Sequence, residues 1–368
     1  MTAETAGPVL IRGISYGAAA GLPLSMETQM KSFYYVSALA LLLGTASTLP
    51  AQNQDRQTLV VTASNAATNQ LLVYDASGIL TQTVATGGEG GASGNSGGIA
   101  SWRDQLAVVN FGSQSVSIFQ RSNDGFELKQ VIPTASSPLS VAFGHNHLYV
   151  LGTTKVESHQ IFDYGVASSP DGIAMLFKAD GSAAQVGVLG TQLIISEKSN
   201  AIETVDLTAD KAVTGAATLV QNIPANVSAP FGLVTRGNDA YVTIAHADEI
   251  SLVRRDAVVT VTGSGTQHAP CWVALDGPYL FSSNSPSKSI SRYLAYGNKI
   301  VQQAAVAATL NGSPTDIAYK AGLVAVIDGA GTVSHLSIFK VDGDGNLNLA
   351  GVATTPRTNG VAIIPGDD

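Results

Sequence analysis

Four short apolar segments separated by turn residues follow one another between residues 98 and 138. They cover residues 98–101, 106–110, 115–121 and 126–132, with Asn, Asp, Gly and Ser gathered between them. Alternation of polar and apolar positions with a period of two is typical of β-strands, and the intervening residues are typical of hairpin turns. The stretch is therefore predicted to form a four-stranded antiparallel sheet, which could not bury both of its faces alone.

The same pattern recurs along the chain. A proline opens the first strand of later copies, at Pro138, Pro230, Pro270 and Pro314, and the last three lie 40 and 44 residues apart. The gap of 92 residues between Pro138 and Pro230 leaves room for one further copy, which residues 186–207 supply. Periods of ~40–45 residues with four strands each are typical of the blades of a β-propeller.

The two ends of the repeat region are incomplete, and each supplies what the other lacks. Residues 59–85 contain three strands without the first one, whereas residues 359–364 form a first strand without the other three. Pairing the two ends completes a seventh blade and removes the exposed sheet edges of an open array. We therefore predict an all-β fold, a seven-bladed β-propeller over residues 58–365, closed by N- and C-terminal strands that share one blade.

The N-terminal part of the chain has the features of a targeting segment. Residues 30–51 contain a basic start, an apolar run of about 12 residues and a small-residue exit, the pattern of a secretory signal peptide. That run is too short for an ordinary transmembrane span of ~20 residues. We expect residues 1–29 to be an over-long start outside the fold, with Met30 as the initiator. The mature protein is then expected to be secreted, extracellular or periplasmic.

Composition and charge exclude some classes of partner. The chain of 368 residues has a formal net charge of −8, and only 12% of its residues are charged. This argues against a nucleic-acid or anionic-membrane partner. The single cysteine, Cys271, cannot form an internal disulfide, and no Cys or His pair has zinc-ligand spacing. We expect a monomer without metal or cofactor, although oxygen ligands for Ca²⁺ or Mg²⁺ from separate blades would leave no spacing signal.

Two stretches depart from the repeat. Residues 153–172 are expected to form a long loop insertion in the third blade, of the kind that often carries ligand or partner contacts. Residues 87–98 are rich in glycine and are expected to form a flexible connector between the first two blades. Residues 94–98 match G-x-S-x-G, but a nucleophile elbow requires a following helix and none is predicted. No catalytic serine is therefore expected there.

The topology predicts which loops lie on one face. The segment before each first strand and the turn after each second strand share a face, called the upper face below, around the central channel where propellers bind ligands. Histidine with a carboxylate can act as acid and base, and arginine can hold an anion. The predicted catalytic residues are His268 or His246 as acid and base, Glu197 as the group that orients it, and Arg357 as anion holder. The predicted substrate-binding residues are Lys198, Asn110, Asn284, Trp272, Asp316 and His159, with Asn359 on the same face. For each residue taken alone, a solvated polar rim is the simpler explanation.

Residues 106–119 resemble the repeat of the seven-bladed lactonase family, which includes propeller 6-phosphogluconolactonases and 3-carboxy-cis,cis-muconate cyclases. The resemblance covers roughly residues 59–365 and implies chemistry on lactones or carboxylate-bearing acids, with histidine, arginine and glutamate acting in the channel of a cyclase. The first strands of this chain begin without histidine. Residues 241–244 equally resemble YVTN-type propellers of extracellular and surface-layer proteins. Two functions stay open: a secreted lactonase or cycloisomerase, or a non-catalytic propeller that binds a glycan or protein.

Overall fold

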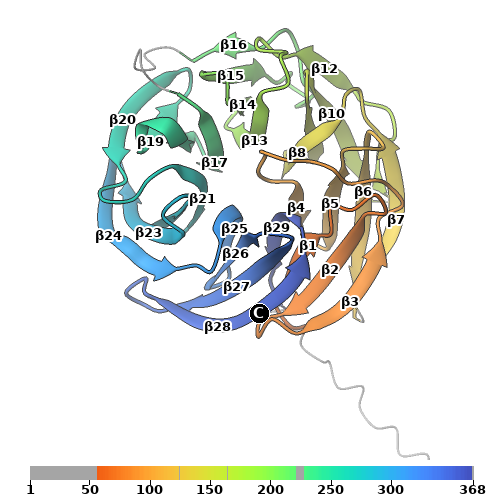
Figure 1. Ribbon diagram of the computed structural model, residues 1–368. Helices are drawn as coiled ribbons and strands as arrows, with labels where there is room; N and C mark the ends of the chain where they lie inside the picture. The colour runs from red at the N-terminus through yellow and green to blue at the C-terminus, as the bar shows by residue number, and fades with distance from the viewer. Residues whose placement is uncertain (1–55, 124, 164, 221–227, 367–368) are drawn as a thin grey trace, which may run out of the picture. The chain divides into compact units, whose positions relative to one another are not determined.

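The computed structural model describes residues 56–123, 125–163, 165–220 and 228–366. These residues form seven antiparallel sheets that stand side by side in a ring (Figure 1). The first strand of each sheet lies next to the ring axis and the fourth lies at the circumference. The predicted all-β, seven-bladed propeller is therefore confirmed. The predicted signal segment, residues 30–51, and residues 1–29 lie outside the described residues.

In blades 2 to 7 the strands are consecutive in sequence and are ordered from the axis outwards, whereas blade 1 takes its innermost strand from residues 359–364. Blade 1 contains β29 (Asn359–Ile364), β1 (Leu59–Ala63), β2 (Gln70–Asp75) and β3 (Leu80–Ala85). Blade 2 contains β4 (Ile99–Trp102), β5 (Gln105–Asn110), β6 (Ser115–Ser122) and β7 (Gly125–Pro133). Blade 3 contains β8 (Pro138–Gly144), β9 (His147–Gly152), β10 (Lys155–Phe162), and the short β11 (Gly165–Val166) and β12 (Gly172–Met175). Blade 4 contains β13 (Ala183–Leu189), β14 (Gln192–Glu197), β15 (Ala201–Asp206) and β16 (Thr218–Leu219).

Blades 5 to 7 complete the ring, again from the axis outwards. Blade 5 contains β17 (Pro230–Arg236), β18 (Asp239–Ile244), β19 (Glu249–Arg254) and β20 (Ala257–Gly263). Blade 6 contains β21 (Pro270–Asp276), β22 (Tyr279–Asn284), β23 (Ser289–Tyr296) and β24 (Lys299–Thr309). Blade 7 contains β25 (Ser313–Lys320), β26 (Leu323–Ala330), β27 (Val333–Val341) and β28 (Leu347–Pro356). The helical element among the described residues is the 3₁₀ turn Ala245–Ala247, and no helix there is long and apolar enough to cross a membrane.

The hydrophobic core lies between neighbouring blades. Each second strand is buried on both faces, so that it carries a nearly continuous apolar run such as Leu106–Val109 in β5. Apolar side chains from each pair of neighbouring blades interdigitate in a cluster of their own; Leu106 and Val108 pack with Val61 and Leu71 of blade 1, for example. No single blade can therefore be folded without its neighbours, as the repeat pattern indicated.

The ring is closed as predicted. β1 and β29 are antiparallel neighbours, with Leu59 opposite Ile364 and Val61 opposite Ala362. Alternate residues of β29 face the two adjoining blades: Ile364 packs in the cluster of blades 1 and 2, and Ile363 packs in the cluster of blades 1 and 7. The C-terminal strand thus contributes to two interfaces at once.

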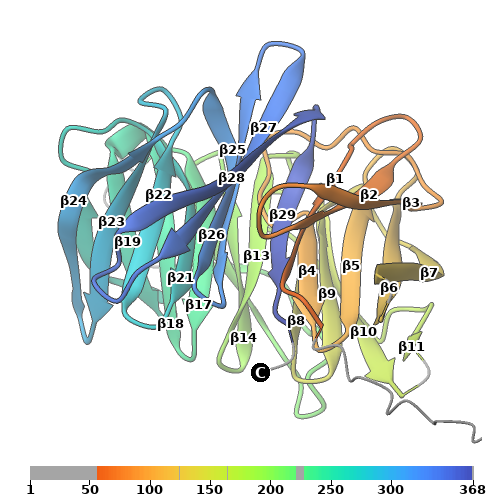
Figure 2. The ribbon, with the colours of Figure 1, turned by 90° about the horizontal axis from the view of Figure 1, so that it is seen from below.

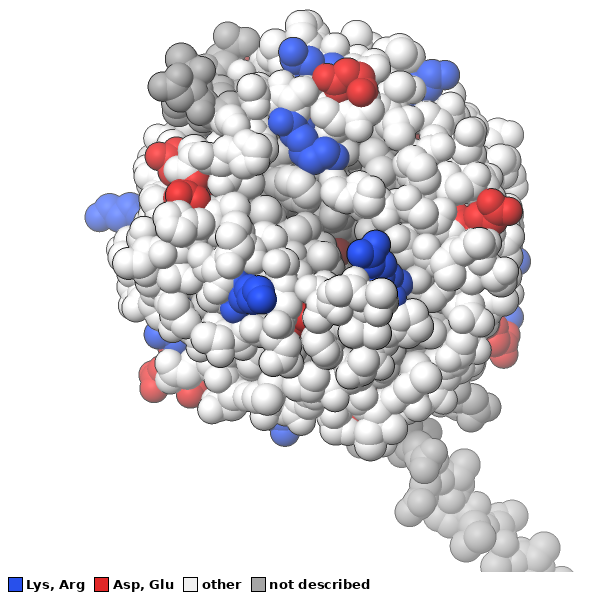
Figure 3. Space-filling view, in the orientation of Figure 1, with Lys and Arg blue, Asp and Glu red and all other residues white. Residues whose placement is uncertain are grey.

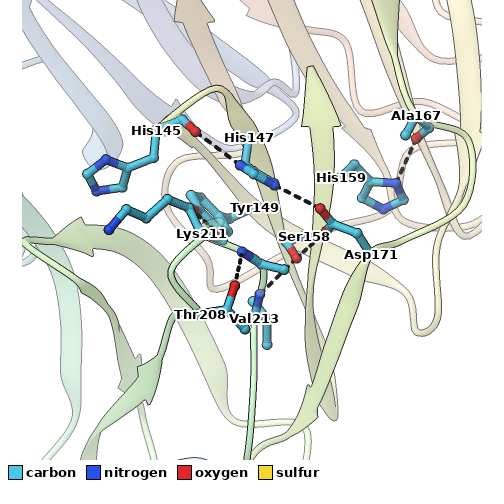
Figure 4. Close-up of polar contacts among 11 residues, drawn as sticks. His145, His147, Tyr149, Ser158, His159, Ala167, Asp171, Thr208, Lys211 and Val213 are labelled. Atoms are coloured by element: carbon cyan, nitrogen blue, oxygen red, sulfur yellow. Dashed lines mark hydrogen bonds and ion pairs between the residues drawn. The ribbon is translucent and has the colours of Figure 1, made fainter. Parts of the chain in front are cut away.

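The predicted loop insertion at residues 153–172 is wrong, because residues 155–162 form β10, the third strand of blade 3. Its alternation is hidden by polar residues at buried positions. His159 is fully buried, and its Nδ1 bonds the carbonyl oxygen of Ala167 at 2.8 Å (Figure 4). Its Nε2 lies 3.3 Å from Glu157 Oε1. His159 therefore lies inside the blade, and the prediction that it lies on the upper face is also wrong.

Candidate functional site

The glycine-rich stretch after β3 runs to the centre of the ring. Residues 86–98 leave the outer strand of blade 1 and cross towards the axis before they enter β4 (Figure 1). Residues 94–98, called the axial segment below, contact the inner strands of blades on all sides. The prediction of a flexible connector is wrong for this part, because hydrogen bonds hold the segment to blades 1, 3, 4, 6 and 7.

Asn95 supplies bonds to three of these blades. Its Nδ2 donates to the carbonyl oxygen of Leu139 at 2.5 Å and to Asn359 Oδ1 at 3.1 Å, and Asn359 Nδ2 donates back to Asn95 Oδ1 at 2.8 Å. The indole Nε1 of Trp272 donates to the backbone oxygen of Asn95 at 3.2 Å. Asn95 is only 2% exposed, so blades 1, 3 and 6 hold it in the interior.

Ser96 and Gly97 bind the remaining two blades and blade 3 again. Ser96 N donates to the carbonyl oxygen of Ala184 at 3.1 Å, and Ser96 Oγ donates to Asp316 Oδ1 at 2.9 Å. The carbonyl oxygen of Gly97 accepts a bond from Val141 N at 2.9 Å. Gly97 has φ 65°, and a Cβ there would lie 2.9 Å from Ser140 Oγ. Only glycine combines this left-handed backbone with so close an approach.

Below the axial segment lies a cavity of about 330 Å³ along the ring axis. The end of the cavity next to the axial segment, called the inner end below, is lined by Ser96, Gly97 and Asp316. The opposite end is lined by Ser101 and Lys320, which lie near the C-terminal ends of β4 and β25. Between them the walls are mostly apolar, with Leu233, Val273, Leu275, Ile317 and Ile363. The axial segment therefore borders one end of the cavity, which we call the axial cavity.

Asp316 is the ionisable group at the inner end of this cavity. It is 3% exposed, and burial raises its pKa to about 7 against the opposing effect of its hydrogen bonds. Besides Ser96 Oγ, the donors are the backbone N–H groups of Ile317 and Gly97, and that of Val361 at 3.3 Å. A carboxyl group with such a pKa is divided between its acid and base forms near neutral pH, as a general base requires.

Gln185 completes the polar groups at the inner end. Its Oε1 accepts a bond from Leu233 N at 2.6 Å, which fixes the side chain between blades 4 and 5. A Cβ on Gly97 would lie 3.2 Å from Gln185 Nε2, so the amide NH₂ lies against the axial segment. Among the described residues no acceptor is recorded for this NH₂ group, which leaves it free to bind a ligand oxygen in the cavity.

The four residues predicted to be catalytic lie on the upper face, but each has its own local partner. His268 Nδ1 bonds Asp248 Oδ2 at 2.9 Å, and His246 Nδ1 bonds Ser228 Oγ at 2.8 Å. Arg357 Nη2 donates to the carbonyl oxygen of Gly331 at 3.2 Å. Glu197 is buried and accepts a bond from Ser182 Oγ. No recorded contact joins these four residues and none lines the axial cavity, so the geometry gives no support to a joint catalytic role.

Two predicted substrate-binding residues make hydrogen bonds within their own blades. Asn110 and Asn284 end the second strands of blades 2 and 6 and are fully buried. Asn110 Nδ2 donates to Ser117 Oγ at 2.7 Å, and Asn284 Nδ2 donates to Ser291 Oγ at 2.8 Å. The repetition of one arrangement in two blades indicates that both amides hold the following turn to the third strand.

Three other predicted substrate-binding residues, Lys198, Trp272 and Asp316, converge on the axial segment. Lys198 Nζ donates to the carbonyl oxygen of Gly94 at 2.6 Å and lies 5.7 Å from the ring centre of Phe231. Trp272 packs edge-on against the same Phe231 ring, with centroids 5.1 Å apart. Lys198 and Trp272 therefore support the segment, whereas Asp316 also faces the cavity.

The upper face is hollowed at its centre (Figure 3). Basic side chains lie around the hollow, and most of the acidic side chains visible on this face lie towards its rim. The connections of this face include Lys198, Lys288 and Arg357. Despite the net charge of −8, the approach to the axis from this side is therefore locally basic.

A second cavity, of about 740 Å³, lies on the flank between blades 2 and 3 (Figure 2 shows β6, β10 and β11 side by side). Gln105, Gln120 and Gln130 line it together with Lys129 and Phe162.

Within the described ranges, no group of three or more His, Cys, Asp and Glu side chains is placed to hold a metal ion. Cys271 is partly buried, and desolvation raises the pKa of its thiol to about 12, which makes it a poor nucleophile.

Sequence reasoning missed Asn95, Ser96 and Gln185. The only sequence signal is the G-x-S-x-G match at residues 94–98, which lacks the following helix that such a motif requires. Each bond that fixes these residues joins positions far apart in the chain; Ser96 and Asp316, for example, are separated by 220 residues. Local patterns carry no information on such pairs.

The fold resembles solved propellers at low sequence identity. A protein of Bacteroides fragilis named as a candidate 6-phosphogluconolactonase aligns with a TM-score of 0.62 and 14% identity, over 86% of this chain and 99% of its own. A counterpart named in the same way from Bacteroides uniformis gives 0.61 and 14%, over 84% of this chain and all of its own. A protein of unknown function from Desulfotomaculum acetoxidans gives 0.64 and 12%, over 84% and 100%. No protein-family model and no curated protein matches the sequence. These likenesses show a β-propeller fold.

Proposed function

We propose that the protein hydrolyses a small lactone in its axial cavity. The observation that carries this proposal is the position of Asp316, a buried carboxyl group with a pKa raised to about 7, at the inner end of a cavity of about 330 Å³. This volume lies at the lower end of the range for small-molecule sites, roughly 300–1,000 Å³. Such a cavity admits one compact ring and excludes a polymer.

The walls favour one class of lactone. They are mostly apolar, and Lys320 at the far end is the one basic residue among the lining residues. A lactone ring is compact and uncharged, and its carbonyl needs only one or two hydrogen-bond donors. A phosphate dianion would need more positive charge than one lysine supplies. Although two similar folds are named as candidate 6-phosphogluconolactonases, we therefore favour unphosphorylated lactones with at most one anionic substituent as substrates.

Hydrolysis should depend on the base form of Asp316. The rate above the spontaneous reaction is expected to rise with pH and to level off above about pH 7, because only the ionised carboxylate can accept a proton. Asp316→Asn is expected to lower kcat/KM by about 10²–10⁴-fold, the usual contribution of a general base. Titration of released acid with a panel of γ- and δ-lactones and 6-phosphogluconolactone measures both quantities.

The exposed Asp344 provides a matched control, and Asp344→Asn should keep the wild-type rate and pH profile. Thermal unfolding of each variant shows whether a loss of rate reflects a loss of fold. Absence of turnover of every lactone by the folded wild-type protein would overturn the proposal and leave ligand binding without catalysis as the better account.

A further inference from the structure

Ser96 is fixed with its hydroxyl group between the cavity and a carboxylate. Its backbone N–H is bound to Ala184, and its Oγ donates its proton to Asp316 Oδ1 at 2.9 Å. Ser96 is 4% exposed and lines the axial cavity. Because the hydroxyl proton is directed at Asp316, the lone pairs of Oγ remain available to a reacting atom. This is the arrangement of a nucleophile with its base.

The other donors around Asp316 exclude a simpler mechanism in which it activates a water molecule directly. Oδ1 already accepts from Ser96 Oγ and Ile317 N, and Oδ2 accepts from Val361 N, with the Gly97 N–H as a further donor. Three of these donors are backbone groups, which cannot give up a proton to a carboxylate. Ser96 supplies the one proton that Asp316 can take in the free protein.

Gln185 is placed to stabilise the oxyanion that such an attack creates. Its Nε2 lies against Gly97, next to the serine, and its Oε1 is fixed by Leu233 N. A preorganised amide donor beside a developing oxyanion typically contributes about 10²–10³ in rate. Gly97 has no side chain that would separate Gln185 from a carbonyl group bound at Ser96.

We propose that Ser96 is the nucleophile of this site and forms an ester with the opened lactone. The proposal rests on the lactone hydrolysis proposed above. The sequence alone predicted no catalytic serine at residues 94–98, because no helix follows the G-x-S-x-G match. In a nucleophile elbow a strand and a helix fix the serine, whereas here hydrogen bonds to the surrounding blades fix it.

The reaction balances without any further reagent. Ser96 Oγ attacks the lactone carbonyl carbon and its proton passes to Asp316, while the carbonyl oxygen becomes an oxyanion beside Gln185. The bond between carbonyl carbon and ring oxygen then breaks, and the ring oxygen leaves as an alcohol with the proton from Asp316. Asp316 is now free to accept a proton from water, which attacks the ester and releases the hydroxy acid. The proton returns to Ser96 Oγ.

The ester has a specific mass. Because the ring opens without loss of a leaving group, the trapped protein should be heavier by the whole mass of the lactone. We expect acid quenching during turnover, followed by intact-protein and peptide mass spectrometry, to show this single addition on Ser96. After rapid mixing with the lactone, the adduct should form more slowly at pH 5 than at pH 8, because Asp316 is protonated at the lower pH and cannot accept the serine proton.

Ser96→Ala should give no adduct and lower kcat/KM by at least about 100-fold, whereas Ser77→Ala, at an exposed turn position, should behave as the wild type. If Ser96→Ala fails to fold, a serine-directed phosphonate on the wild type gives the same answer by the labelled position. Undiminished turnover by folded Ser96→Ala overturns the nucleophile but not the lactonase. Labelling of Ser96 without turnover of any lactone overturns the lactonase but not the nucleophile.

Discussion

A chain that ends at Thr358 should be insoluble or unfolded. Removal of β29 takes Val361, Ala362, Ile363 and Ile364 away from the two interfaces that they fill, and each is at most 7% exposed. Burial of one such side chain contributes about 1.5–3 kcal/mol for the larger residues, so the loss approaches the usual net stability of roughly 5–15 kcal/mol. It also leaves β1 with an unpaired edge, which favours aggregation.

Soluble yield, circular dichroism and size-exclusion chromatography measure this effect. A chain that ends at Gly366 keeps all of β29 and serves as the control; it should fold as the full chain does. A synthetic peptide of residues 359–366, added during refolding, should restore part of the soluble fraction, because it can occupy the vacant position beside β1. A truncated chain that remains monomeric and cooperatively folded would show that the shared blade is not needed for closure.

Glu197→Gln should make the protein markedly more stable in alkaline solution. Burial is the main cause that raises the pKa of Glu197 to about 8, and the charge of Glu203 acts in the same direction. One carboxylate oxygen, Oε1, has no hydrogen-bond partner. Between about pH 4.5 and about 8 the folded protein keeps a proton that the unfolded chain releases. The free energy of unfolding therefore falls as pH rises, by about 1.4 kcal/mol per unit.

The loss is complete above about pH 8 and is on the order of 5 kcal/mol. The glutamine side chain of the variant carries no charge at any pH, so the variant and the wild type should have similar stability near pH 4.5 and diverge up to about pH 9. Denaturant unfolding across this range measures the difference. Glu127→Gln, which changes a solvent-exposed glutamate, is the control, and its curve should run parallel to that of the wild type. Equal pH dependence in Glu197→Gln would contradict the pKa assigned to Glu197.

The architecture could be predicted because it depends on local and periodic features of the sequence. Alternating positions identified strands, Pro230, Pro270 and Pro314 marked the period, and the missing first strand at residues 59–85 required a partner from the other end. Strand topology also placed Asp316 correctly at the start of an inner strand. Each of these inferences uses neighbours in sequence or a repeat, so no long-range contact had to be known.

The site could not be predicted in the same way. The glycines at residues 87–98 suggested flexibility, but they permit close passage of the backbone through the ring, where Asn95 and Ser96 bind side chains and carbonyls of distant blades. The strand β10 is hard to recognise because Glu157 and His159 occupy buried positions that usually carry apolar side chains. His246, His268 and Arg357 share a face with the channel, yet a shared face does not bring side chains together.

The central claim, that the reaction takes place in the axial cavity and not on the upper face, is tested most directly by kcat/KM for a small lactone in two variants. Ser101→Phe places a ring in the cavity near the end opposite Asp316, and Arg357→Ala removes the predicted anion holder on the upper face. The cavity account predicts a loss of at least about tenfold for Ser101→Phe, since entry of the substrate is obstructed, and an unchanged value for Arg357→Ala. Full activity in Ser101→Phe together with loss of activity in Arg357→Ala would contradict it.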